Sequence, residues 1–462
     1  MNIPPKKIIS SFALSSSAQS SVIQPKNIQE VENCLKYAKK NKLKIAIMGS
    51  GNSWTDVFLA TDQLIVDLSH FDQINSFDKE NGIVNVQSGV KIGNLLARVM
   101  PENFTLIGLS GSVTDTIGGM LSSNVHGKDT WKEGNFGQNI ISFTMLLADN
   151  SIISVDREKN NELFNAVIGG LGFLGIVLDI SLKLKRIKSY MLELQTHQCH
   201  NLDELFEYFY SLEKNNLDFS YGLIDPFQTG NSLGRAICES ASYQEIENCS
   251  RKDFEEFLTP KSKIAMLKPE TFWKLFRFFW GYRTSKIWNG FQYNRAKESR
   301  GKFIPFPKFQ YPISAFPKFN LMYAPSGFME FHTVFPKNEV KDAFIELLEK
   351  STHYKRQPWV CGVKRHKKDP SYLSFSEDGL AITINFPLNN FPKYEREKYC
   401  DELISIITKH TGKIYISKHA YLPKKIFEEM YPDHTKILDL KNKYDPEIIF
   451  SSIATERLLL KK

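Results

Sequence analysis

Residues 111–119 read GSVTDTIGG and form the second of three glycine-rich joints in the first 180 residues. The first joint is GSGNSW at residues 49–54, and the third is GLGFLG at residues 170–175. Backbone N–H groups of small residues in such turns bind anions, and Ser and Thr hydroxyls add hydrogen-bond donors and acceptors. Three joints in this order within one domain predict a site for a polar cofactor that carries a diphosphate.

The third joint matches the GxGxxG fingerprint of dinucleotide-binding Rossmann folds. In that fold a strand precedes the glycines and a helix follows, so that the helix N-terminus holds the pyrophosphate. Here the hydrophobic pattern predicts a helix before the glycines, at residues 161–168, and a strand after them, at residues 176–184. The sequence therefore disfavours a Rossmann fold, because the order is reversed.

Length and composition indicate a folded chain of several domains. At roughly 150 residues per domain, 462 residues suggest about two to three domains. Apolar residues make up 42% and charged residues 24%, which excludes a disordered or fibrous chain. The net charge of +8 suits an anionic substrate, a phosphate-bearing cofactor, a membrane surface or nucleic acid. Because no helix-turn-helix, ribonucleoprotein or zinc signature is present, we expect no nucleic-acid partner.

Cysteine usage and hydropathy predict a cytoplasmic protein. The six scattered cysteines lack a CxxC pair, so reduced thiols are expected. Residues 1–21 lack the apolar core of a signal peptide. The longest run of apolar residues and glycine, residues 166–178, is shorter than the about 20 residues that span a bilayer. His197, Cys199 and His200 crowd together without the further ligands of a zinc site, so no metal is predicted.

Hydrophobic spacing predicts a mixture of helices and strands along the whole chain. In the first part, helices are expected at residues 27–42 and 92–99, and strands at residues 44–48, 63–68, 82–87, 143–147 and 152–155. Beyond about residue 185, strands are expected at residues 219–224, 327–335 and 379–387, and helices at residues 341–348 and 396–408. The tail should form a strand followed by a helix.

Taken together, the ordered motifs resemble the FAD-binding oxidoreductases of the vanillyl-alcohol oxidase superfamily, which carry a PCMH-type FAD domain. The shared pieces are the helix at residues 25–38, the three joints, and HGK at residues 126–128. Within the superfamily, residues 124–140, 413–432 and 443–452 are similar to the oxidase subunits of decaprenylphosphoryl-ribose 2′-epimerases. The resemblance covers nearly the whole chain and is weakest between about residues 239 and 320.

The resemblance implies an α+β fold with FAD as the cofactor. A two-subdomain FAD-binding domain at residues 1–187 would be followed by a substrate domain with a large antiparallel sheet at residues 188–417. Residues 418–462 would return to the FAD domain, and the flavin would lie between the domains. Cofactor contacts are implied for residues of the joints and the HGK segment: Gly49, Ser50, Gly51, Asn52, Ser53, Gly111, Ser112, Thr116, Gly118, Gly119, Asn124, His126, Gly127, Gly172, Gly175 and Ile176.

Two positions that differ from the pattern of the superfamily affect covalent chemistry. Asn52 stands where several relatives have a histidine that bonds covalently to the flavin, and no cysteine lies in a matching motif. An amide cannot form that bond, so the sequence predicts non-covalent FAD. Thr383 stands where the resembled subunits have a reactive cysteine, so cysteine-directed covalent inhibitors are expected to fail.

The resemblance assigns catalysis to Lys418 and His126. A lysine desolvated beside a flavin can accept a proton from a substrate hydroxyl, or it can hydrogen-bond the sugar. An imidazole at His126 can position the substrate or transfer a proton. Substrate contacts are assigned to Tyr415, Lys364, His332, Glu330, Thr383 and Trp54. Glu330 replaces a glutamine of the resembled subunits, which changes the hydrogen-bond polarity toward a substrate.

These residues predict oxidation of a secondary hydroxyl of a sugar to a ketone, with hydride transfer to flavin N5. The resemblance implies a phosphate- or polyprenyl-phosphate-linked sugar, and a separate short-chain NADH-dependent reductase that completes an epimerisation. A sugar-lactone or alditol oxidase that uses oxygen is the alternative enzyme. The alternative of another class is a catalytically inactive protein that binds carbohydrate or a membrane surface.

Residues 272–302 concentrate the positive charge of the chain. They hold eight basic residues and one acid, a local balance of +7, together with three of the six tryptophans. Aromatic rings among cations are what an interfacial segment needs, with rings at the headgroup level and cations near anionic phosphates. The sequence leaves two interpretations open, a peripheral membrane contact and an aromatic core with a solvated charged face.

Overall fold

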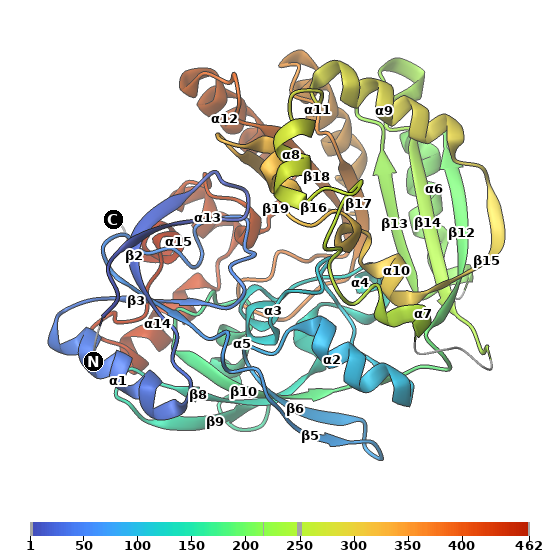
Figure 1. Cartoon of the computed structure of the whole chain (residues 1–462). Coiled ribbons are helices and arrows are strands. Elements are labelled where there is room, and N and C mark those ends of the chain that lie inside the picture. Colours follow the sequence, from blue (N-terminus) through green and yellow to red (C-terminus); the bar gives the residue numbers. More distant parts are fainter. Residues whose placement is uncertain (1–2, 216, 247–251, 461–462) are drawn as a thin grey trace.

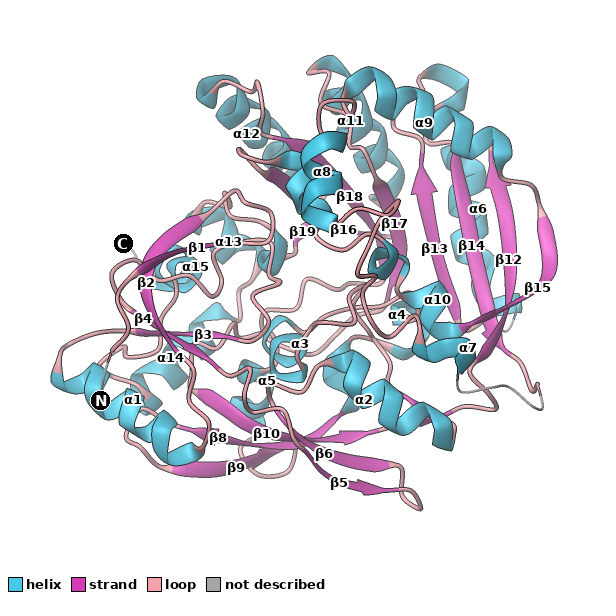
Figure 2. Ribbon diagram, viewed as in Figure 1, coloured by secondary structure: helices cyan, strands magenta, loops and turns pink. Residues whose placement is uncertain are grey.

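The computed structural model describes residues 3–215, 217–246 and 252–460 (Figure 1). Within these ranges the chain forms sheets of four, five, two and eight strands, with helices packed around them (Figure 2). Cys249 lies outside the described residues, and the other five cysteines are buried free thiols, as expected. The mixture of helices with a large antiparallel sheet confirms the predicted fold class at this level.

The first sheet lies near the N-terminus and has the strand order β1-β2-β4-β3. Its strands are β1 (Lys7–Ser10), β2 (Ser17–Ile23), β3 (Ile45–Met48) and β4 (Leu64–Asp67). β4 runs parallel to β2 and β3, whereas β1 is antiparallel to β2. Helix α1 (Ile28–Lys40) begins after the capping side chain of Asn27. Its apolar stripe packs on the sheet with residues at helical spacing, Val31, Cys34, Leu35 and Ala38.

The second sheet is antiparallel throughout and has the strand order β5-β6-β10-β8-β9. Its strands are β5 (Ile74–Asp78), β6 (Ile83–Gln87), β8 (Ile140–Leu146), β9 (Ile152–Asp156) and β10 (Ile176–Lys183). The helices of this region are α2 (Ile92–Val99), α3 (Ile117–Ser123), α4 (Thr130–Glu133) and α5 (Asn161–Val167). Helix α5 precedes the third joint and β10 follows it, which confirms the reversed order that argued against a Rossmann fold.

The third unit is an eight-stranded antiparallel sheet with the order β15-β12-β14-β13-β17-β18-β16-β19. Its strands are β12 (Met191–Cys199), β13 (Phe219–Ile224), β14 (Ala236–Tyr243), β15 (Ser299–Pro305), β16 (Phe328–Pro336), β17 (Cys361–His366), β18 (Gly379–Pro387) and β19 (Lys413–Ile414). A two-stranded ladder of β7 (Phe104–Thr105) and β11 (Lys185–Arg186) lies before it in the chain. The predicted large antiparallel sheet is therefore present.

Helices cover one face of the eight-stranded sheet. They are α6 (Leu202–Ser211), α11 (Val340–His353) and α12 (Lys393–Lys409). Phe335 of β16 packs on Phe344 of α11, and Phe386 of β18 packs on Tyr399 of α12. Because side chains alternate along a strand, the residues next to Phe335 in β16 and next to Phe386 in β18 point to the opposite face of the sheet. The helices therefore leave that second face, which carries the polar residues described below, to other parts of the chain.

The remaining helices connect the sheets or belong to the tail. They are α7 (Lys252–Glu255), α8 (Pro269–Phe276), α9 (Tyr282–Arg295), α10 (Phe306–Gln310), α13 (Lys424–Met430), α14 (His434–Tyr444) and α15 (Ile453–Thr455). After α14 the chain pairs with the first sheet: Ile45 N–H donates to the Ile449 carbonyl at 2.7 Å, and Ser451 N–H donates to the Ile45 carbonyl at 2.9 Å. The tail thus returns to the N-terminal sheet.

Candidate active site

Alternation along three neighbouring strands brings polar side chains to one face of the eight-stranded sheet. On β16, Glu330 and His332 share this face, and His332 stands opposite Thr383 of β18. On β17, Lys364 stands opposite Ala381, two residues from Thr383, and His366 follows on the same face. These five polar residues form the site face of the sheet, where an apolar surface would be expected if the face served packing alone.

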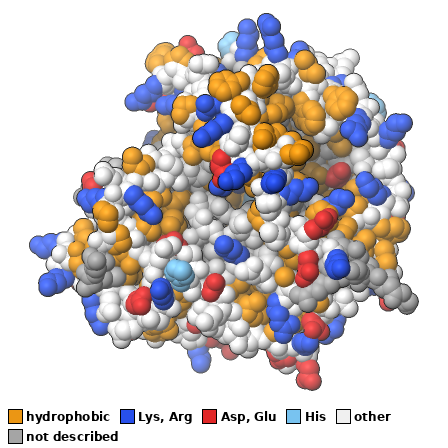
Figure 3. Space-filling model, viewed as in Figure 1, with side chains coloured by type: hydrophobic (Ala, Val, Ile, Leu, Met, Phe, Trp, Pro, Cys, Tyr) orange, Lys and Arg blue, Asp and Glu red, His pale blue; other side chains and the backbone are white. Residues whose placement is uncertain are grey.

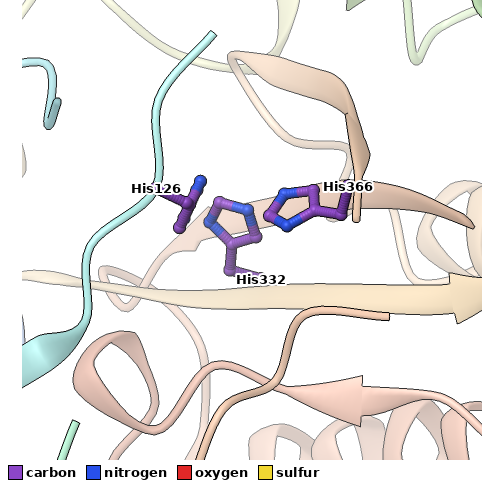
Figure 4. A group of neighbouring side chains, drawn as sticks. All are labelled: His126, His332 and His366. Atoms are coloured by element: carbon purple, nitrogen blue, oxygen red, sulfur yellow. The ribbon is translucent and has the colours of Figure 1, made fainter. Parts of the chain in front are cut away.

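A histidine from the other part of the chain meets this face. One ring nitrogen from each of His126, His332 and His366 lies within 4.8 Å of the other two, and all three side chains are buried (Figure 4). The His126 ring lies 4.7 Å from the His332 ring and 4.8 Å from the His366 ring, measured between centroids. His126 Nδ1 and His366 Nε2 have no hydrogen-bond partner within the part of the chain that the structure describes. Buried ring nitrogens without partners indicate that a ligand completes the site.

The three imidazoles are neutral at neutral pH. Burial lowers the pKa of His126 and His366 well below the usual value, and neighbouring positive charge adds to the effect. Burial also lowers the pKa of His332 to about 4. Three histidines are a common metal-ligand set, but the positive charges of Lys364 and Lys418 that depress the pKa of His126 also oppose a divalent cation. The three histidines are therefore not expected to bind a metal ion.

Lys418 forms an ion pair with Glu330 on the site face. Its Nζ lies 3.0 Å from Glu330 Oε1 and 4.1 Å from the centroid of the Trp54 ring. Burial opposes ionisation of Glu330, but the charge of Lys418 and the nearby His332 lower the pKa of this carboxyl to about 2. The ion pair holds the Lys418 side chain in one position. The pair therefore favours an orienting role for Lys418, one of the two roles that the sequence left open.

Lys364 is the lysine that the strands of the site face themselves carry. It has no ion-pair partner among residues 3–215, 217–246 and 252–460, although its side chain is half-buried. Burial and the neighbouring charge of Lys418 lower the pKa of Lys364 to about 8, although Asp129 and Glu330 act in the opposite direction. About a tenth of Lys364 is then unprotonated at pH 7, which suits a group that accepts a proton.

The three glycine-rich joints lie close together in the structure. Asn52 Nδ2 of the first joint donates to Thr114 Oγ1 and to Asp115 Oδ1 of the second joint, both at 2.8 Å. Beside the third joint, Gly169 N–H donates to the carbonyl of Leu121 in α3 at 2.9 Å. Helix α3, which begins at the second joint, therefore holds all three joints together.

Four of the predicted cofactor glycines are required by protein packing. A Cβ at Gly49 would lie 2.2 Å from Thr116 Oγ1, and a Cβ at Gly127 would lie 2.3 Å from Asp129 Oδ1. The glycines enclosed in this way are Gly49, Gly118, Gly127 and Gly175. Their absent side chains let protein segments approach each other, so these positions support the site from behind.

Other glycines of the joints remain accessible to a ligand. Gly51 and Gly172 have φ values of +67° and +71°, in the left-handed region that favours glycine. Gly111 and Gly119 are exposed, and a Cβ at Gly111 would meet only Ile313 Cδ1 at 3.6 Å. Exposed backbone at these turns is where a flat cofactor can approach closely.

The remaining predicted cofactor residues occupy defined places. Ser50 bonds the Thr114 carbonyl through its hydroxyl, and Ser112 bonds Thr114 Oγ1 at 2.9 Å. Three further residues make contacts within the protein. The Ser53 carbonyl accepts from Phe12 N–H, and Thr116 is the N-cap of α3. The Asn124 side chain donates to Asp369 and Ser371. The Ile176 side chain, directly after the third joint, lies in the apolar core of the first sheet.

The other predicted substrate residues frame the site face. Tyr415 donates its hydroxyl proton to the Ser123 carbonyl at 2.8 Å, and its N–H donates to the His332 carbonyl at 2.8 Å. These two bonds link the end of α3 to β16 beside Lys418. Thr383 Oγ1 accepts from Gly362 N–H at 2.7 Å. The structure therefore brings all eight predicted catalytic and substrate residues into one region: Lys418, His126, Tyr415, Lys364, His332, Glu330, Thr383 and Trp54.

Two further residues belong to the site and were not predicted. His366 completes the histidine group, and its Nδ1 is hydrogen-bonded with Ser376 Oγ at 2.9 Å. The ammonium of Lys128 lies 4.0 Å from the ring centroids of both Tyr221 and Phe309. Burial lowers the pKa of Lys128 to about 7. A signal for Lys128 was available, because it is the last residue of the HGK motif.

Comparison with known proteins identifies the cofactor. Residues 20–156, which include the first two joints and the His126 segment, match the family described as FAD binding domain. The chain is an FAD-binding flavoprotein. The orphaned ring nitrogens and the open glycine turns fit this cofactor, because they offer polar contacts and backbone access where a flavin needs them.

Curated relatives extend the similarity over most of this flavoprotein. Decaprenylphosphoryl-beta-D-ribose oxidase of Mycolicibacterium smegmatis is 23% identical over 89% of this chain and 88% of its own length. L-Gulonolactone oxidase of Mus musculus is 24% identical over 94% of both chains. Mitochondrial L-galactono-1,4-lactone dehydrogenase of Arabidopsis thaliana is 29% identical over 35% of this chain and 26% of its own length. The relatives thus share a flavin-type domain with this chain and carry the names of different sugar substrates.

Proposed function

We propose that this flavoprotein oxidises a secondary hydroxyl of a sugar to a ketone. The observation that carries the proposal is the meeting of Lys364, Glu330 and His332 on the site face with His126 and Lys418 beside the glycine joints. Bound FAD supplies the hydride acceptor. The protein then has two tasks, to accept the hydroxyl proton and to hold the sugar in one orientation.

Lys364 is the proposed proton acceptor. Its unprotonated Nζ takes the hydroxyl proton as the carbon–hydrogen bond breaks and the carbon–oxygen double bond forms. The pKa of about 8 places this lysine close to neutral pH, where a general base combines availability with basicity. The ion-paired Lys418 donates a hydrogen bond to a sugar oxygen. The neutral His126 and His332 each offer one N–H donor and one acceptor to the sugar ring.

The charge of the site favours a phosphate-bearing substrate. Besides the proton acceptor Lys364, two lysines, Lys128 and Lys418, lie in or beside it, and Glu330 is the carboxylate that pairs with Lys418. A phosphate offers the remaining positive charge a partner. We therefore propose a phosphate- or polyprenyl-phosphate-linked sugar, whose ketone a separate short-chain NADH-dependent reductase would reduce to complete an epimerisation.

A second candidate function is oxidation of a sugar lactone or alditol with oxygen. It is supported by the similarity to L-gulonolactone oxidase over 94% of both chains. The two candidates share the flavin and the site face, and they differ in the charge of the substrate and in the electron acceptor.

Anaerobic flavin bleaching separates these candidates. The FAD-loaded protein is mixed without oxygen with a polyprenyl-phosphate pentose, a nucleotide sugar, a free alditol and an aldonolactone, and flavin absorbance is followed. We expect bleaching by the phosphate-linked sugar and a ketone product detected by mass. Bleaching by the alditol or lactone, with peroxide formed in air, supports the second candidate. A protein that stays colourless after FAD is added, or a flavin that no sugar bleaches, contradicts both.

A further inference from the structure

Exposed hydrophobic side chains concentrate in one short stretch of the chain. Of the 19 large hydrophobic side chains that are exposed among the described residues, nine lie within residues 266–291. Figure 3 shows hydrophobic side chains gathered at the top of the molecule, over α8 and α9, with Lys and Arg among them. Monomeric proteins rarely expose large contiguous apolar patches, and such patches mark contact surfaces.

Helix α9 turns apolar side chains away from the protein. Ser285 and Tyr293 are buried and lie two turns apart, so they mark the face that packs on the protein. At 100° per residue, Ile287 and Phe291 point to the opposite side of the helix. Ile287 is 71% exposed and Phe291 is 49% exposed. These two side chains therefore point away from the surface on which α9 packs.

The segment between α8 and α9 has the same character. Trp273 anchors α8, because its ring is buried and its Nε1 donates to the Pro317 carbonyl at 2.8 Å. Phe278 and Phe279 follow this anchor and are each 75% exposed. The sequence left open that the aromatic residues of residues 272–302 form a core. The structure buries Trp273 but leaves Phe278 and Phe279 exposed, so only part of these aromatic residues is core. Phe278, Phe279, Ile287 and Phe291 form an outward apolar ridge.

Cations surround this ridge. Lys274, Arg283, Lys286 and Arg295 are exposed and have no ion-pair partner in the described part of the chain. They belong to the stretch whose local balance is +7. The structure contains, within its described residues, no helix that is long and apolar enough to cross a membrane. Apolar side chains that project outward among unpaired cations complement a surface that is apolar inside and anionic outside.

We propose that the ridge docks this protein on the surface of an anionic lipid bilayer. Phe278, Phe279, Ile287 and Phe291 insert between headgroups, and the four cations around them bind lipid phosphates. Each cation near such a surface is expected to contribute about fivefold to affinity. The proposal concerns the surface alone and does not depend on the identity of the substrate.

The ridge also borders the sheet that carries the site. A small pocket beneath α9 is lined by Trp288 of that helix, by Leu223 of β13 and by Val360 and Cys361 at the start of β17. Lys364 lies three residues beyond Cys361 on the same strand. If the proposed polyprenyl-linked substrate is correct, docking would place its membrane-embedded tail close to the strand that bears the proton acceptor.

Vesicle flotation of the full-length, FAD-loaded protein tests the docking surface. The vesicles contain phosphatidylcholine alone or with about one third phosphatidylglycerol. One variant carries Lys274→Gln, Arg283→Gln, Lys286→Gln and Arg295→Gln, and a second carries Phe278→Ser, Phe279→Ser, Ile287→Ser and Phe291→Ser. The matched control replaces four exposed lysines of another region, Lys26, Lys40, Lys42 and Lys159, by glutamine.

We expect binding to the anionic vesicles and weak binding to neutral ones. The cation variant should lose several hundredfold in affinity, from about fivefold per cation, and the apolar variant should lose the binding that remains at high salt. The control should change affinity less than fivefold. No binding of the wild type to anionic vesicles overturns the proposal and favours a protein partner for the ridge. An equal loss of vesicle affinity in the control variant also overturns the proposal, because binding then depends on the net charge of the protein and not on the ridge.

Flavin bleaching by a soluble phosphate-linked sugar, measured on the same variants, separates this result from the proposed function. All three variants should bleach at the wild-type rate, since none changes a residue of the site. Retained flavin absorbance shows that they are folded.

Discussion

The pH dependence of flavin reduction tests the assignment of Lys364 as the proton acceptor. Its pKa of about 8 means that the unprotonated fraction rises from about one tenth at pH 7 to about nine tenths at pH 9. The second-order rate constant for flavin reduction should therefore rise about tenfold over this interval and then level off, because only the unprotonated amine accepts the hydroxyl proton. Stopped-flow absorbance under anaerobic conditions measures this rate.

Variants of Lys364 and of its neighbours sharpen the same test. Lys364→Arg keeps the positive charge but cannot accept a proton near neutral pH, so it should lower the rate about 10²- to 10⁴-fold and remove the rising limb. Lys418→Met removes a positive charge that depresses the pKa of Lys364, so the midpoint should move above 8. Glu330→Gln removes a charge that raises this pKa, so the midpoint should move below 8.

Opposite shifts of one midpoint are hard to obtain from general damage to the site. A rate that is independent of pH between 7 and 9 in the wild type would refute the assignment. So would full activity of Lys364→Arg, or a midpoint that moves in the same direction in the Lys418 and Glu330 variants. Flavin absorbance and thermal unfolding of each variant check that the cofactor and the fold are retained.

Three further predictions concern the cofactor, an inhibitor position and the tail. Acid precipitation of the protein should release all FAD into the supernatant, because Asn52 cannot form a covalent bond to the flavin. Flavin that stays in the protein pellet would contradict non-covalent binding. Thr383→Cys should gain labelling of the peptide around residue 383 by a cysteine-directed electrophile, detected by mass spectrometry, and an unlabelled peptide contradicts the alignment. Lys441→Met should lower the free energy of unfolding in urea by about 3–5 kcal/mol, because it leaves Asp445, fully buried and 2.7 Å from Lys441 Nζ, without its partner. The exposed Lys436→Met should cost at most about 1 kcal/mol, and equal effects of the two contradict the buried pair.

Secondary structure was predictable where the hydrophobic pattern was regular. The strands expected at residues 219–224 and 379–387 coincide with β13 and β18, and the helix expected at residues 27–42 is α1 with its cap at Asn27. Strand β17, CGVKRH, was not predicted, because Arg365 interrupts the apolar positions that Cys361 and Val363 begin on the opposite face, and Gly362 is a poor strand former.

The sequence predicted most residues of the site, but it did not predict how their charges pair. The motifs and the resemblance named His126, His332, Lys364 and Lys418, which the structure brings together. The Lys418–Glu330 ion pair joins residues 88 positions apart, so only the fold reveals it. His366 joins the histidine group through strand register, which local sequence patterns do not specify.

A crystal structure of the FAD-loaded protein tests the assignment of the active site most directly. We predict that the flavin ring lies against His126 and faces Lys418 and the strands that carry Glu330, His332 and Lys364, with its diphosphate beside Gly51 and Gly111. A flavin ring bound away from His126 and from this face of the sheet, or a diphosphate that does not touch the glycine joints, would contradict the site described above.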